Sequence, residues 1–155
     1  MALVRKISEL PTAAPAAPRE LYRDAYVSML LYEEQQLVRF IRSAQPFPNL
    51  DVPPQVYETI IRLAERFARP GFSLLTDLRA APGRNDPAFE AVMLPLRGRL
   101  QAPFARRATL VATAVGAMQV RRLTKEDGME RMVSSDEAEL LRYLSGPSDG
   151  KPGVR

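Results

Sequence analysis

The middle of the chain alternates between a short apolar segment and a longer segment with a helical repeat. Residues 72–78 read FSLLTDL, an apolar run that follows the breaker pair Pro70-Gly71 and predicts a buried strand. After a turn-rich loop, Asp86 is placed to N-cap a helix, with Pro87 at its first position. The apolar face expected on this helix consists of Ala88, Phe89, Val92, Met93, Leu96 and Leu100.

Two β-rich segments come before this unit. Residues 26–32 and 37–41 are apolar or alternating, and the short polar link between them predicts a hairpin. A proline-rich loop follows, and a helix is expected from about Pro53 to about Ala68. Its buried stripe is expected to contain Val56, Ile60, Ile61, Leu63, Ala64 and Phe67.

The C-terminal part repeats the order of strand and helix. Residues 108–113, ATLVAT, predict a second buried strand, and a helix of small residues is expected from Ala114 until Gly128. Residues 129–133 predict a short strand near a sheet edge. The alternation of strands with helices argues for a mostly parallel sheet covered by helices.

The last helix is expected to start after Ser134 or Ser135 as its N-cap. The predicted fold class is therefore α/β: a mostly parallel, four- to five-stranded sheet with an N-terminal hairpin and about four helices. The inner side chains of the last helix are expected to be Ala138, Leu140, Leu141 and Leu144.

The two ends of the chain differ in composition from the middle. Residues 1–20 are expected to form a flexible tail and a Pro/Ala linker, residues 21–145 the folded domain, and residues 146–155 a flexible C-terminal tail. An alternative for the first ten residues is a short helix that docks on the domain or on a partner. The apolar positions that suggest it are Leu3, Val4, Ile7 and Leu10.

Composition excludes several classes of site. The chain of 155 residues has no cysteine and no histidine, which removes thiol chemistry, the commonest general base and the commonest metal ligand. No apolar run reaches the length of a membrane span, and the N-terminal run is too short for a secretory signal. We therefore expect a cytoplasmic protein without a transmembrane segment.

Charge is distributed unevenly along the chain, which has a net charge of +4. Arginines dominate residues 79–122, and carboxylates dominate residues 124–139. The plain interpretation is a solvated surface. The alternatives are an arginine-lined surface that meets an acidic segment of another protein, or a homodimer in which the basic middle of one copy meets the acidic end of the other. Nucleic acid is not an expected partner, because the sequence contains no known nucleic-acid-binding motif.

Three segments together resemble a known fold. They are the strand ending TDLRAA before a helix, the ATLVAT strand before a small-residue helix, and the closing VSSDEAELLRYL. Over about residues 25–145 the chain resembles the STAS-like fold of sulfate transporters and anti-sigma-factor antagonists, and is most similar to its SpoIIAA-like branch. The resemblance implies a regulatory module that binds other proteins, or in some branches apolar or nucleotide ligands.

The resemblance does not bring the family's phosphorylation switch with it. The antagonists carry a phosphorylatable Ser or Thr at the start of the helix after the third strand. Residues 83–87 occupy this position here, and no hydroxyl side chain occurs between Thr76 and Thr109. A phosphate-controlled contact at this helix is therefore not expected.

The loop after residues 72–78 holds the polar groups closest to a catalytic or metal site. Asp77 with Arg79 has the form of a general base with a charge partner, and Asn85 with Asp86 supplies oxygens suited to a metal. Simpler roles explain the aspartates: ending a strand and capping a helix. The sequence therefore assigns no catalytic residue, no metal and no cofactor, and predicts a protein that is not an enzyme.

Parallel strands bring the loops at their carboxyl ends to one edge of the sheet. We therefore expect a mildly basic partner-binding surface there, made by Arg79, Arg84, Asn85, Thr113 and Gly116. The function predicted from this surface is a regulatory or scaffolding module that binds another protein with an acidic segment. The alternative is a carrier or sensor of a lipid-like or other small apolar ligand, held between sheet and helices.

Overall fold

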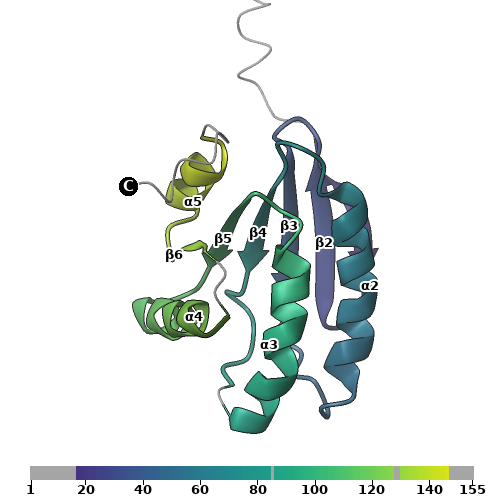
Figure 1. The fold of residues 1–155 in the computed structure, drawn as a ribbon, viewed down its shortest axis with the longest axis vertical. Helices are drawn as coiled ribbons and strands as arrows, with labels where there is room; N and C mark the ends of the chain where they lie inside the picture. Colours follow the sequence, from purple (N-terminus) through teal and green to yellow (C-terminus); the bar gives the residue numbers. More distant parts are fainter. Residues whose placement is uncertain (1–16, 85, 128–129, 147–155) are drawn as a thin grey trace, which may run out of the picture.

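The computed structural model describes residues 17–84, 86–127 and 130–146, which form one six-stranded mixed sheet with four helices (Figure 1). The strands are β1 (Arg19–Arg23), β2 (Val27–Tyr32), β3 (Leu37–Arg42), β4 (Ser73–Asp77), β5 (Arg106–Leu110) and β6 (Met132–Ser134). The helices are α2 (Val52–Phe67), α3 (Pro87–Gln101), α4 (Ala114–Asp127) and α5 (Glu137–Leu144). The predicted α/β class and the hairpin of β2 and β3 are confirmed.

The strands lie in the sheet in the same order as in the sequence. β1, β2 and β3 pair antiparallel, whereas β3, β4, β5 and β6 are parallel neighbours. β4 and β5 are parallel neighbours, as a mostly parallel sheet requires, with Thr76 opposite Thr109 in the register. Because the order of the six described strands never reverses, these strands form no topological switch point, but the carboxyl ends of the four parallel strands still share one edge.

The prediction of four to five strands was wrong, because the sheet has six. The strand that was missed is β1, with the sequence RELYR, which begins inside the range assigned to the linker. Arg19, Glu20 and Arg23 are exposed, and only Leu21 and Tyr22 pack against the core. A polar strand at a sheet edge has no apolar run by which the sequence reveals it. Residues 1–16 and 147–155 of the predicted tails lie outside the described residues.

Helices cover both faces of the sheet. Figure 1 shows α2 and α3 side by side across one face, with α4 and α5 at the end that carries β6. Val38 and Phe40 of β3 point into the core under α2 and α3, whereas Leu37 joins the smaller core under α5. This alternation follows from the two-residue period of a strand. No helix within the described ranges is long and apolar enough to cross a membrane.

Local signals explain where the helices begin. Asp86 caps α3 as predicted, since its carboxylate accepts a hydrogen bond from the backbone N–H of Phe89. The N-cap of α5 is Asp136 rather than the serines expected from the sequence, and it accepts from the N–H of Glu139. α4 ends at Asp127, and its predicted stop, Gly128, lies outside the described residues.

We predict that Phe40→Ala destabilises the protein by about 3–5 kcal/mol, because Phe40 is 1% exposed and its loss leaves a sealed void. Phe89→Ala should cost only about 1–2 kcal/mol, because Phe89 is half-buried at the edge of the same core. Urea unfolding measures both. An equal cost for the two variants would contradict the difference in burial.

Candidate functional site

A cavity of about 380 Å³ opens at the edge where the parallel strands end. It lies between the loops that follow β3, β4 and β5 and the helices α2, α3 and α4. Its volume falls within the usual range of small-molecule pockets, roughly 300–1,000 Å³. Its apolar wall is made chiefly by Phe47, Tyr57, Phe89, Met93 and Val111.

The rim of the cavity is exposed. It is formed by residues 81–84 after β4 and by residues 112–116 at the start of α4, most of which are exposed. Val115 is 66% exposed there, which is unusual for a large apolar side chain. The apolar interior therefore has direct access to solvent.

Four of the five residues predicted as a partner site line this cavity: Arg79, Arg84, Thr113 and Gly116. The fifth, Asn85, lies outside the described residues. The backbone N–H of Gly116 donates to the Thr113 hydroxyl oxygen at 3.0 Å, so Thr113 caps α4. The sequence thus placed these residues at one edge, but it did not reveal the cavity between them.

Arg84 has two contacts at the rim. Its Nε donates to Oδ1 of Asp86 at 2.6 Å, and its guanidinium lies 4.5 Å from the centre of the Phe89 ring. The ion pair and the stacking hold a cation over an aromatic wall of the cavity.

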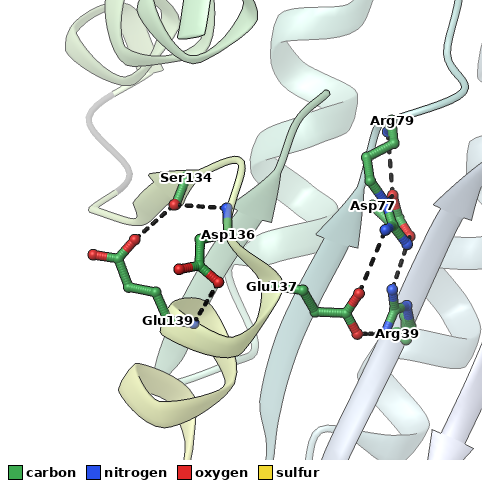
Figure 2. Close-up of polar contacts among 7 residues, drawn as sticks. All are labelled: Arg39, Asp77, Arg79, Ser134, Asp136, Glu137 and Glu139. Atoms are coloured by element: carbon green, nitrogen blue, oxygen red, sulfur yellow. Dashed lines mark hydrogen bonds and ion pairs between the residues drawn. The ribbon is translucent and has the colours of Figure 1, made fainter. Parts of the chain in front are cut away.

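Arg79 is tied into a cluster of ion pairs at the carboxyl end of β4 (Figure 2). Its Nη2 and Nε donate to the two carboxylate oxygens of Asp77 at 2.7 and 3.0 Å. On the other side, Nη2 of Arg39 donates to Asp77 at 2.9 Å, and Nη1 of Arg39 donates to Glu137 at 2.9 Å. The cluster therefore joins β3, β4 and α5.

The arginines control the protonation of these carboxylates. Burial by itself would raise the pKa of Asp77, but hydrogen bonds from Arg79 and Arg39 outweigh it and lower that pKa to about 2. The hydrogen bond from Arg39 also lowers the pKa of Glu137. A carboxylate that is held ionised and occupied on both oxygens is a poor general base near neutral pH.

The start of α5 is built to present Glu137 to this cluster. Figure 2 shows Ser134, Asp136 and Glu139 joined by hydrogen bonds at the first turn of the helix. The Ser134 hydroxyl donates to the Glu139 carboxylate at 2.6 Å and accepts from the N–H of Asp136 at 2.9 Å. Glu137, from the acidic residues 124–139, thus pairs with Arg79, from the arginine-rich residues 79–122, within the same chain. The homodimer in which these segments pair between two copies stays a prediction.

Sequence reasoning missed three of the arginines that line the cavity: Arg122, which is exposed, and the less exposed Arg42 and Arg97. Arg42 is 6% exposed at the end of β3, two positions after Phe40, which the two-residue period places on the buried face. The two-residue period of the strand could have indicated a buried side chain at Arg42, but the predicted strand, residues 37–41, ended before this position. Arg42 and Arg97 each have a buried Nε with no hydrogen-bond partner among the described residues.

The cavity does not have the features of a metal centre. Within the described parts of the chain, no group of three or more Asp or Glu side chains is arranged to hold a metal ion. Asp86, one of the two oxygen donors considered from the sequence, is occupied by Arg84 and by the start of α3.

Comparison of the chain with protein-family models, curated proteins and solved structures finds no match.

We predict that Asp77→Asn lowers the free energy of unfolding by about 2 kcal/mol at pH 7, from the shift of the Asp77 pKa from 3.8 to about 2. Because the folded pKa lies below the unfolded one, this stabilisation is complete above about pH 4 and is lost as the pH falls towards 2. Urea unfolding of wild type and variant at several pH values measures the difference.

Asp86→Asn is the matched control for this prediction, since an amide oxygen still caps α3 and the side chain is more exposed. Its stability should differ little from wild type. A difference between wild type and Asp77→Asn that stays constant down to pH 2 would contradict the role given to Arg39 and Arg79.

Proposed function

We propose that the protein binds a small, largely apolar molecule in the cavity and acts as its carrier or sensor, without catalysing a reaction on it. The observation that carries this proposal is an apolar cavity of about 380 Å³ with an open rim. The apolar walls of this open cavity offer water no hydrogen bonds, so covering them with an apolar molecule is favourable. A ligand of that kind would bury the walls.

The rigidity of the walls supports the same function. Phe47 stacks on Tyr26 with ring centres 5.0 Å apart, and Tyr57 packs against Phe40 at 5.6 Å. Two aromatic walls of the cavity are therefore fixed by neighbours in the core. A preformed apolar site of this kind is typical of ligand binding.

A second candidate function is the regulatory contact with another protein that the sequence predicts, within a STAS-like, SpoIIAA-like domain. Val115 and Met118 are each 66% exposed about one turn apart on α4, beside the arginines of the rim. An apolar pair next to cations suits a partner surface that is apolar and acidic. The run of parallel strands with helices between them supports the STAS-like assignment.

We predict that the neutral fluorophore N-phenylnaphthylamine binds to the wild-type protein with a rise in fluorescence. Ala81 is half-buried at the rim of the cavity, so Ala81→Trp should obstruct part of its opening and weaken binding by about tenfold or more. Ala91→Trp is the matched control, because Ala91 is exposed on α3 and does not line the cavity.

Circular dichroism and urea unfolding show whether both tryptophan variants keep the wild-type fold. Equal binding by the two folded variants would contradict a site in this cavity. The absence of any binding to wild type would contradict the ligand-binding function and leave the contact with another protein as the better account.

A further inference from the structure

We propose that the ligand is an amphipathic anion, with an apolar body in the cavity and a carboxylate or phosphate group held by the guanidinium of Arg42, assisted by Arg97. This inference rests on the proposed ligand-binding function and specifies its chemical class. It follows from the pairing of the charges around the cavity, from the surroundings of Arg42 and from the shape of the apolar wall.

The lining carries an excess of cations. Among the described residues, five arginines line the cavity against one carboxylate, Glu90; they are Arg42, Arg79, Arg84, Arg97 and Arg122. Arg79, Arg84 and Arg97 each have a carboxylate partner in the chain. Within the described residues, no carboxylate lies within 4.0 Å of Arg42, although its side chain is among the most buried of the five.

Arg42 is therefore a desolvated cation without ion-pair contact to a described carboxylate, and of these carboxylates only the more distant Asp24 opposes its desolvation by its charge. Its recorded contacts are one hydrogen bond from Nη2 to the carbonyl oxygen of Gln45 at 3.2 Å and a position 4.3 Å from the centre of the Phe47 ring. These contacts offset only part of the cost of removing a full charge from water. Burial accordingly lowers the pKa of Arg42. An anion in the cavity would supply the missing counter-charge.

Arg97 and Tyr57 place further donors near the same position. Arg97 uses Nη2 for Glu90, and its buried Nε has no partner among the described residues. Tyr57 is 3% exposed, and burial raises its pKa to about 12, while the charges of Arg42 and Arg97 oppose the rise. The phenol hydroxyl therefore keeps its proton at neutral pH. Guanidinium groups offer paired N–H donors that match the two oxygens of a carboxylate or phosphate.

The remaining side chains of the lining determine the chemical character of the ligand's body. From Arg42 the aromatic wall runs through Phe47 to Phe89, whose ring centres lie 6.5 Å apart, and Arg84 covers Phe89 at the rim. Met93 and Val111 complete the apolar lining. These side chains cannot hydrogen-bond a polar body, but they can bury an alkyl or aromatic one. Because the rim cation Arg84 is already paired with Asp86, the buried Arg42 beside an apolar wall suits a ligand with a single charged head.

The test compares ligands of one chain length in displacing N-phenylnaphthylamine from the wild-type protein: octanoate, octyl phosphate, octanol and inorganic phosphate. We expect octanoate or octyl phosphate to displace the fluorophore at concentrations at least about tenfold lower than octanol. The better of the two anions identifies the head group. Inorganic phosphate alone should not displace the fluorophore, because it lacks the apolar body.

Arg42→Met keeps an unbranched side chain without its charge and should abolish the preference for the anion over octanol, with each competitor compared against the fluorophore affinity measured for that variant. Arg42→Lys should keep part of the preference. Arg99→Met is the matched control, because Arg99 pairs with Glu58 outside the cavity and should retain the full preference.

Two results would overturn the inference and leave the proposed function standing: equal displacement by octanol and the anions, or a full anion preference in folded Arg42→Met. Displacement by inorganic phosphate as strong as by octyl phosphate would overturn the apolar body of the ligand. If neither the fluorophore nor any octyl compound binds, the proposed function itself fails. The comparison of ligands on wild type decides the question even if Arg42→Met does not fold.

Discussion

The ion pairs around Asp77 hold together the edge of the sheet on which the site depends. Asp77 is the last residue of β4, and its carboxylate is shared by Arg39 of β3 and Arg79 of the following loop. Arg39 and Arg79 also reach Glu137 at the start of α5. A buried carboxylate is stable there only because cations occupy both of its oxygens. The same contacts fix the direction in which the chain leaves β4 towards the cavity.

The buried arginines on the two faces of the sheet differ in their partners. On the side of α5, Arg39 is matched by Asp77 and Glu137. On the side of α2 and α3, Arg42 is buried as deeply but has only a carbonyl oxygen and an aromatic ring as recorded partners. The contrast between two arginines three positions apart on one strand is the reason to regard Arg42 as part of a binding site rather than of the scaffold.

Periodicity in the sequence was sufficient for the strands and helices with an apolar side, including β4, α3 and the N-cap Asp86. It failed for β1, whose RELYR sequence reads as a polar linker, because an edge strand gains its stability from backbone pairing with β2 rather than from burial. The sequence also brought Arg79, Arg84, Thr113 and Gly116 to one edge. It could not show the cavity or the missing partner of Arg42, since both depend on how α2, α3 and α4 pack.

The central claim is that the cavity binds an anion through Arg42, and a crystal structure of the complex with octanoate tests it most directly. The account predicts the alkyl chain between Phe47, Phe89 and Met93, with a carboxylate oxygen about 2.7–3.2 Å from a nitrogen of Arg42. A cavity that stays empty at saturating octanoate and at saturating octyl phosphate, or an anionic head group bound only at the exposed rim beside Arg84, would contradict it.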